Sequence, residues 1–322
     1  MRYRRLGATG LEVSEVGFGA WGIGGVEGGA VGYGPTDDRE STAALRRAFD
    51  LGVTFYDTAD IYGNGHSEEL IGAALHDVRS RIVIATKVGL LGPYGPQDFS
   101  PVHLRASLEA SLRRLQTDYV DLYQLHNPPM ALLAREPDIL GTLEAMRREG
   151  KVRAIGVSVK SPDDGLPAVR ACGVQAAQVN FSMIDQRSRA NGLLALAEEV
   201  GAGLVARTPL CYGFLSGKYS TGTAFEPGDH RAAWSAEQLS VWAGAPRVFG
   251  EAIARTSGTP AQVALRFCLS YGAVAAAIPG MLTTLQVDEN TAASRLGPLG
   301  EEERFAIEAI YAAHEFFMRP QR

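Results

Sequence analysis

The chain has 322 residues, a formal net charge of −5 at pH 7 and three cysteines, and 46% of its residues are hydrophobic. Its lysines and arginines are scattered and form no basic stripe, which argues against a nucleic-acid partner. No stretch approaches the roughly 20 apolar residues that span a bilayer, and the basic amino end lacks the apolar core of a secretory signal.

The remaining composition fits one domain in a reducing compartment. A small, odd number of cysteines is typical of reduced thiols, and no linker rich in proline or serine divides the chain. We therefore expect a cytoplasmic protein with a single domain over residues 1–322 and no membrane partner. The sequence gives no expectation for the oligomeric state.

The amino end predicts a β-hairpin. Residues 2–6 and 11–14 are strand-like and are joined by a short link that starts at Gly7 and ends at Gly10. Because a series of strand and helix units follows, we expect this hairpin to close the floor of a barrel.

Eight short runs rich in β-branched or aromatic residues follow in the chain and alternate with helix-like segments. These runs are residues 16–20, 53–57, 81–87, 120–126, 154–159, 176–181, 204–208 and 275–278. Amphipathic segments lie at 100–115, 138–149, 187–200 and 301–314, the first with Ser100 as its expected N-cap. Eight such units in one chain predict an α/β fold of the (β/α)8 barrel type, whose active sites lie at the carboxyl ends of the strands.

A glycine motif after the first strand suggests an alternative fold. Gly17, Gly19 and Gly22 spell the GxGxxG fingerprint of the doubly wound dinucleotide-binding fold. That fingerprint opens a helix directly, whereas here further glycines follow and the next helix is expected only near Ser41. We therefore interpret the segment as a glycine-rich loop over the barrel mouth, with Trp21 as an aromatic wall.

Four polar side chains lie at or just beyond the ends of three successive predicted strands. They are Asp57 and Tyr62, Lys87, and His126. Each of them alone would be interpreted as structural, as a turn cap, a packed ring, a solvated strand end or a buried histidine. Because all four are expected on one rim of the barrel, we interpret them together as a proton-transfer site.

The chemistry of these groups is that of carbonyl reduction. A tyrosine hydroxyl is a weak acid at neutral pH unless a cation stabilises its anion, and Lys87 can be that cation. Asp57 would keep the lysine charged, and neutral His126 could orient a carbonyl oxygen by a hydrogen bond. No serine or cysteine stands beside a base as a nucleophile, so a hydride from a bound cofactor is the expected attacking group.

Three motifs resemble those of the aldo-keto reductase superfamily: FYDTADIYGNGHSEELIG, DLYQLHNP and IPGMLTTLQVDEN. The resemblance extends from the amino-terminal hairpin to Asn290. It implies a (β/α)8 barrel that binds an extended nicotinamide cofactor without a Rossmann fold and reduces carbonyl groups reversibly. It also implies that Tyr62 is the general acid, that Asp57 and Lys87 tune it, and that His126 orients the substrate.

The same resemblance implies a set of cofactor-binding residues. The set comprises Trp21, Ser158, Gln178, Arg207, Leu210, Gly213, Gly217, Lys218, Gly280, Thr284, Gln286, Glu289 and Asn290. Ser158 and Gln178 match the residues that hold the carboxamide, and Arg207 replaces the tyrosine that stacks on the nicotinamide in many members.

The adenosine end of this set departs from the family pattern. Met281 and Leu282 stand where an arginine or lysine commonly pairs with the 2′-phosphate of NADPH. A phosphate favours such a cation. The resemblance implies NADPH/NADP⁺ as cofactor, and the missing cation keeps NADH/NAD⁺ open as the alternative.

The substrate is expected to be a small carbonyl or alcohol compound, and no metal site is expected. The predicted pocket residues are Trp21, Tyr56, Tyr94 and Asn127. Residues 219–249 are too long for a simple connection and could cover the cofactor or substrate, whereas the short tail after Asn290 suggests an open, permissive pocket.

The main functional hypothesis is an NAD(P)-dependent enzyme that reduces aldehydes or ketones. Two alternatives stay open at this point. One is a sugar or secondary-alcohol dehydrogenase that works in the oxidative direction. The other is a cofactor-binding regulatory subunit that senses redox state, because barrel relatives serve as channel subunits.

Overall fold

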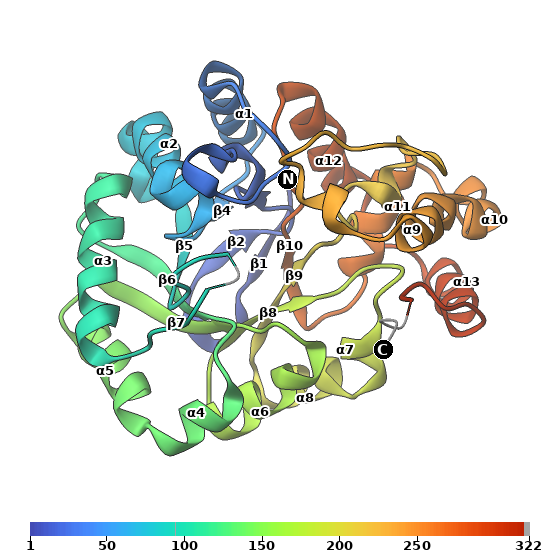
Figure 1. Ribbon diagram of the computed structural model, residues 1–322. Coiled ribbons are helices and arrows are strands. Elements are labelled where there is room, and N and C mark those ends of the chain that lie inside the picture. The colour runs from blue at the N-terminus through green and yellow to red at the C-terminus, as the bar shows by residue number, and fades with distance from the viewer. Residues whose placement is uncertain (94, 319–322) are drawn as a thin grey trace.

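A parallel sheet curled into a barrel forms the centre of the computed structural model, which describes residues 1–93 and 95–318 (Figure 1). Its eight strands follow the order of the chain, and each pairs in parallel with the next. They are β3 (Phe18–Gly19), β4 (Phe55–Asp57), β5 (Val83–Val88), β6 (Val120–His126), β7 (Val152–Ser158), β8 (Ala176–Asn180), β9 (Gly203–Arg207) and β10 (Val274–Ala277). The predicted (β/α)8 fold is confirmed.

The first and last strands of the barrel meet and close the ring. Val16 pairs with Ala277, and Gly19 pairs with Gly280, in parallel bridges. Gly19 lies so close to the neighbouring backbone that a Cβ atom would be 2.8 Å from the carbonyl oxygen of Ile278. The GxGxxG segment therefore closes a barrel and does not open the helix of a dinucleotide-binding fold.

Helices surround the barrel on its outer face (Figure 1). They are α1 (Asp38–Asp50), α2 (His66–Leu75), α3 (Pro101–Leu115), α4 (Met130–Arg135), α5 (Pro137–Arg148), α6 (Pro162–Cys172), α7 (Arg187–Ala190), α8 (Leu193–Val200), α9 (Ala236–Val248), α10 (Gly250–Ala254), α11 (Pro260–Cys268), α12 (Thr284–Leu296) and α13 (Glu301–Ala312). Ser100 caps α3 as predicted, because its side chain accepts a hydrogen bond from the His103 N–H.

Two helix predictions need correction. The expected helix over residues 187–200 is divided into α7 and α8, because Gly192 adopts a φ of +85° and the Asn191 side chain accepts a hydrogen bond from the Leu193 N–H. Helix α1 begins at Asp38, three residues before the expected start, because the side chain of Asp37 caps it.

The amino-terminal hairpin consists of β1 (Tyr3–Arg5) and β2 (Glu12–Ser14), which pair in antiparallel register. Its link packs against the amino end of β9, where the Ala8 N–H donates to the Gly201 carbonyl at 2.8 Å. Leu6, Leu11 and Val13 join the apolar cluster that fills the barrel interior. The predicted closure of the barrel floor is confirmed.

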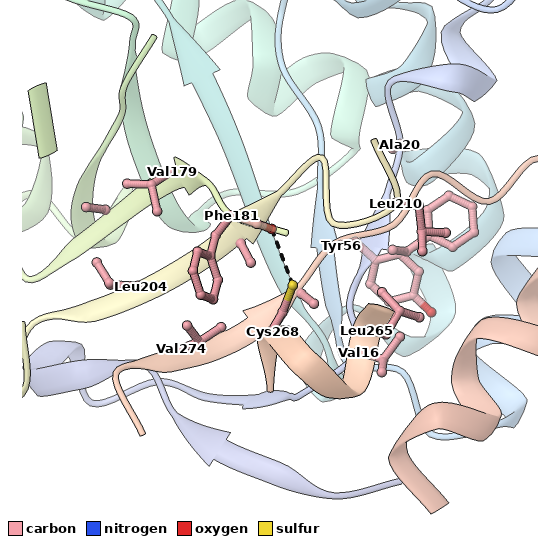
Figure 2. Packing of buried hydrophobic residues seen from close by; sticks show 14 of the residues in the cluster. Val16, Ala20, Tyr56, Val179, Phe181, Leu204, Leu210, Leu265, Cys268 and Val274 are labelled. Carbon is pink, nitrogen blue, oxygen red and sulfur yellow. Dashed lines mark hydrogen bonds between the residues drawn. The ribbon is translucent and has the colours of Figure 1, made fainter. Parts of the chain in front are cut away.

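A second apolar layer fills the space between the strands and the helices. Figure 2 shows part of it, in which Phe181 and Leu204 pack near Cys268 of α11. The Cys268 thiol is fully buried and donates a hydrogen bond of 3.3 Å to the Phe181 carbonyl. None of the helices in the described part of the chain has the length and hydropathy that a bilayer crossing requires.

Candidate active site

The four predicted acid-base residues meet at the carboxyl rim of the barrel. Asp57 ends β4, Lys87 lies in β5, His126 ends β6, and Tyr62 begins the short helix η4 (Tyr62–Gly65). The Lys87 ammonium donates hydrogen bonds to Asp57 Oδ1 at 2.6 Å, to the Thr58 carbonyl at 2.7 Å and to the Tyr62 hydroxyl at 3.1 Å. All three protons of the ammonium group therefore have a partner.

Lys87 carries its charge in a fully buried position. Burial by itself lowers the pKa of Lys87, but the charge of Asp57 and the contact with Tyr62 outweigh it, and the pKa is raised above its ordinary value. The lysine is therefore a fixed cation against the Tyr62 oxygen.

His126 stands beside Tyr62, with the two rings edge to face and their centroids 6.0 Å apart. Burial lowers the pKa of His126 well below its ordinary value, and the nearby charges of Lys87 and Arg207 lower it further. The imidazole is neutral at physiological pH. Its buried Nδ1 atom has no hydrogen-bond partner among the described residues.

Two amides hold the second oxygen of Asp57. Gln178 Nε2 donates to Asp57 Oδ2 at 2.6 Å, and Gln124 Nε2 donates to the same atom at 3.3 Å. Gln124 was absent from the predicted site. It lies two residues before His126 on β6, and this spacing places both side chains on the same face of the strand, so the alternation of the strand could have identified it.

Gln124 has room because its neighbour on the next strand lacks a side chain. Gln124 pairs with Gly156 in the β6–β7 register, and a Cβ atom on Gly156 would lie 3.2 Å from Gln124 Cγ. The glycine therefore leaves space inside the barrel for the amide beneath Asp57.

A chain of hydrogen bonds joins Asp57 to the predicted cofactor side of the rim. Arg207 Nη1 donates to Ser158 Oγ at 3.3 Å, and Ser158 Oγ donates to Gln178 Oε1 at 3.1 Å. Gln178 then reaches Asp57 through its amide nitrogen. Arg207 also donates through Nε to Asn180 Oδ1 at 2.8 Å.

A cavity of about 760 Å³ opens above these residues. Its wall includes Asp57, Tyr62 and His126, and it includes part of the predicted cofactor set: Trp21, Gln178, Arg207, Leu210, Gly213, Gly280 and Gln286. The structure therefore brings the predicted acid-base residues and these predicted cofactor residues to one cavity.

Other members of the predicted cofactor set lie outside the cavity wall. Ser158 is buried behind Gln178, and Asn290 is buried on α12. Lys218 forms an ion pair with Glu289 at 3.0 Å, which joins the loop after β9 to α12. Gly217 lies in the loop after β9, and Thr284 begins α12.

Only some of the predicted pocket residues line the cavity. Trp21 and Asn127 line the cavity. Tyr56 requires correction, because it is fully buried in the layer between strands and helices, where Figure 2 shows it, and its hydroxyl donates to the carbonyls of Leu45 and Val53. Tyr94 lies outside the described residues.

The direction of Tyr56 follows from its place in the strand. Successive side chains of a strand point to opposite faces, so the inward direction of Asp57 directs Tyr56 outward. This alternation was available in the sequence.

Several cavity residues were missed in the sequence. They are chiefly Tyr33, Lys160, Tyr212, His230 and Trp234. His230 and Trp234 belong to residues 219–249, which fold into the short helix η7 (His230–Ala233) and α9. The unusual length of this segment was the only signal for them in the sequence.

Comparisons with known proteins place the chain among proteins of one family. The sequence model of the aldo/keto reductase family matches residues 15–312 of the chain. The chain is similar to a probable voltage-gated potassium channel subunit beta of Arabidopsis thaliana, with 33% identity over 321 residues and 93% of each chain covered.

Two solved structures share the fold over almost the whole chain. The holo form of aldo-keto reductase AKR11C1 from Bacillus halodurans has a TM-score of 0.80 and 28% identity and covers 100% of this chain and 99% of its own. Glycerol dehydrogenase AKR11B4 from Gluconobacter oxydans has a TM-score of 0.79 and 29% identity, with coverage of 99% and 98%. Since the family match spans nearly the entire chain, this protein belongs to the aldo/keto reductase family of oxidoreductases.

Proposed function

We propose that this protein is an NAD(P)-dependent oxidoreductase that reversibly reduces aldehydes or ketones to alcohols, with Tyr62 as the general acid. The observation that carries the proposal is the position of the Lys87 ammonium, which donates to both Asp57 and the Tyr62 hydroxyl. Asp57 and Tyr62 stand at the wall of a cavity large enough for a small substrate beside a nucleotide, and Lys87 is buried beneath them.

Tyr62 gives its proton to the carbonyl oxygen during reduction. The phenolate that results is stabilised by Lys87, whose ammonium is 3.1 Å from the phenolic oxygen. In the oxidative direction the same phenolate accepts the proton of the alcohol. A general acid held in this way typically contributes about 10²-fold to 10⁴-fold in rate.

His126 orients the carbonyl group. Because the imidazole is neutral, it carries one N–H that can donate to the carbonyl oxygen and leaves the proton transfer to Tyr62. His126 lines the cavity and is only 5% exposed, so little water reaches this hydrogen bond.

The residues of the cavity fit a nicotinamide cofactor, which supplies or accepts the hydride when bound. In this proposal Ser158 and Gln178 hold the carboxamide, and Arg207 and Trp21 flank the ring. The loop with Leu210, Gly213, Gly217 and Lys218 holds the phosphates. The segment with Gly280, Thr284, Gln286, Glu289 and Asn290 holds the adenosine.

The turn geometry of the loop after β9 supports this assignment. Gly213 and Gly217 have φ values of +93° and +75°, a conformation that glycine adopts without strain. Backbone N–H groups in turns of this kind can point toward one position and bind an anion. Gly280 lines the cavity without a side chain that would hinder close approach.

We propose NADP(H) as the cofactor and NAD(H) as the alternative. The family resemblance supports NADP(H), whereas two positions favour NAD(H). Met281 is uncharged and fully buried, and Lys218 is already paired with Glu289, so neither supplies a free cation for a 2′-phosphate. Fluorescence titrations with NADPH and NADH test this point. Equal affinity for the two dinucleotides would contradict the NADP(H) assignment.

The catalytic proposal is tested by following nicotinamide absorbance with a simple aldehyde. Replacement of Tyr62 by Phe removes the proton donor and keeps the ring, so we expect kcat to fall by about 10²-fold or more while dinucleotide affinity is retained. Unchanged turnover in the Y62F protein would refute the role of Tyr62.

A regulatory subunit is the second candidate, because a relative with 33% identity is named as a probable potassium channel subunit beta. A pure sensor would bind the dinucleotide without steady-state turnover of any carbonyl or alcohol compound. Multiple turnovers with an aldehyde, or with an alcohol in the reverse direction, would exclude a purely regulatory role.

A further inference from the structure

Arg207 carries a positive charge in the cavity wall without an acidic partner. It ends β9, lines the cavity and is half-buried, and a guanidinium group stays protonated in proteins. Its nitrogen atoms contact neutral side chains: Asn180 Oδ1 at 2.8 Å, Ser158 Oγ at 3.3 Å and Asn127 Oδ1 at 3.5 Å. Among the side chains that the structure describes, no carboxylate forms an ion pair with it.

The backbone after Arg207 holds this charge in place. Thr208 has a φ of +52°, which is rare for a β-branched residue. Its hydroxyl donates to the Arg207 carbonyl at 2.7 Å and lies 3.1 Å from Asn180 Oδ1, the atom that also accepts from the guanidinium. Backbone strain of this kind persists only where the surrounding structure fixes it. The guanidinium therefore has a defined position on the rim.

The charge of Arg207 acts on the acid-base residues. After burial, the charges of Lys87 and then Arg207 lower the pKa of His126, which lines the same cavity. Asp57 offsets the charge of Lys87 at 2.6 Å, whereas no acid offsets that of Arg207. This wall of the cavity therefore carries an uncompensated positive charge.

The chemistry of the proposed function brings the nicotinamide ring to this wall. The carbonyl oxygen that meets Tyr62 and His126 is bonded to the carbon that receives the hydride. Hydride donor and acceptor must come within about 3–3.5 Å of each other. The ring that donates the hydride must therefore lie close to His126, within reach of the charge of Arg207.

The two redox forms of the dinucleotide differ by one charge. The oxidised nicotinamide ring is a cation and the reduced ring is neutral, whereas the phosphates, riboses and adenine are the same in both forms. Contacts outside the ring therefore contribute equally to the two affinities, and the ratio of the affinities reports the surroundings of the ring.

We propose that Arg207 makes the site discriminate between the redox forms, so that the reduced dinucleotide binds more tightly than the oxidised one. The proposal rests on the proposed carbonyl reduction and adds a specificity-determining residue to it. The guanidinium repels the oxidised ring in a half-buried site, where water and salt screen charges less than at the surface. The reduced form then loads the site preferentially, and the oxidised form leaves it more readily.

Isothermal titration calorimetry with NADPH and NADP⁺, and with NADH and NAD⁺, tests the proposal without any substrate. In the wild type we expect the Kd of the oxidised form to exceed that of the reduced form. Arg207→Gln removes the charge and keeps an amide that can donate to Asn180, so the ratio of the two Kd values should fall by about tenfold. For a two-electron couple this equals about 30 mV in the potential of the bound dinucleotide.

Two outcomes of this titration would overturn the proposal. One is a wild-type protein that binds both redox forms equally or prefers the oxidised form, which needs no variant to observe. The other is a ratio that stays the same in R207Q.

Two further variants separate the charge from the shape and from other cations. Arg207→Lys keeps the charge without the planar group and should keep the ratio within about threefold of the wild type. Lys160→Gln removes an exposed cation of the same cavity, which solvent screens, and should leave the ratio unchanged. A loss of preference in R207K, or one in K160Q as large as in R207Q, would show that the charge of Arg207 is not its source.

The binding ratio keeps this proposal separate from the proposed catalysis. A wild type that turns over an aldehyde and binds both redox forms equally would refute the role of Arg207 alone. A preference for the reduced form that R207Q loses, in a protein that turns over no carbonyl or alcohol compound, would support that role and refute the proposed function.

Discussion

Lys87 shows how one buried side chain links the whole acid-base site. Its ammonium joins the carboxylate of Asp57 to the phenol of Tyr62 within hydrogen-bond distance of both. Burial of a charge is unfavourable unless paired groups satisfy it, and here a carboxylate, a carbonyl and a hydroxyl do so. The geometry therefore holds a permanent cation where a phenolate would develop.

The amide of Gln124 should affect this site through Asp57. In Gln124→Met the carboxylate loses one donor and attracts the Lys87 proton more strongly, which weakens the Lys87 bond to Tyr62. We expect a decrease in kcat of about tenfold with little change in KM, and an alkaline limb of the reduction pH profile that moves to higher pH.

The matched control for this variant is Leu122→Met. Leu122 lies two residues earlier on the same face of β6 and makes no polar contact with Asp57. We expect its pH profile to match that of the wild type. A profile of Q124M that keeps its wild-type shape while kcat falls would point to a packing effect alone.

Asp60 should make the protein less stable as the pH rises. Burial, and then the charge of Glu68, raise the pKa of Asp60 to about 7, and its Oδ1 atom has no hydrogen-bond partner in the described part of the chain. Between pH 4 and 7 the folded state then binds a proton that the unfolded state has lost. The free energy of unfolding therefore decreases through this interval, by at most about 1.4 kcal/mol per pH unit from this group.

Urea unfolding of the wild type and Asp60→Asn at pH 4 and pH 8 measures this contribution. The asparagine cannot ionise, so the difference in stability between D60N and the wild type should increase in favour of D60N as the pH rises. A difference that stays constant across this interval would show that Asp60 ionises normally in the folded protein.

At the scale of elements, the closure between β3 and the residues after β10 depends on the absence of a side chain at Gly19. In Gly19→Ala the new methyl group would meet the Ile278 carbonyl at 2.8 Å, and backbone cannot move aside cheaply. We expect the free energy of unfolding to decrease by about 1–3 kcal/mol in urea titrations.

Gly141→Ala is the control for this substitution. Gly141 is exposed within α5, and an added Cβ there has no neighbour within 4 Å. We expect a gain of about 0.5–1 kcal/mol because alanine favours the helix. If the two variants had the same stability, the close contact at Gly19 would not be a constraint.

The elements that the sequence predicted well are those with a strong local pattern. Strand β6 has the predicted bounds, Val120–His126, and the Asn127-Pro128 pair directly after it marks its end. The helix over residues 187–200 was wrong because the Asn191-Gly192 pair forms a turn, in which Gly192 has a positive φ. The helical spacing of apolar residues alone does not reveal such a turn.

At the scale of the whole molecule, the cavity joins residues from strands all around the barrel to residues 219–249. A dinucleotide bound there would contact many of these segments at once and would bind the folded state alone. We expect NADPH at about 100 times its Kd to raise the free energy of unfolding by about 2.7 kcal/mol and the thermal midpoint with it.

A thermal shift series over increasing NADPH concentration measures this effect, and AMP serves as a control ligand that lacks the nicotinamide. The midpoint should rise steadily with NADPH and less with AMP. No shift at saturating NADPH would contradict binding of the dinucleotide to the folded barrel.

The sequence by itself determined the barrel and the meeting of Asp57, Tyr62, Lys87 and His126 on one rim. Successive parallel strands place their carboxyl ends at the same side, so local strand patterns were sufficient. Only the tertiary structure decided that Gln124 reaches Asp57 and that His230 stands beside Trp21. Those contacts join side chains across strands that are not neighbours and across a long irregular segment, and their geometry depends on how the closed barrel and its loops pack in three dimensions.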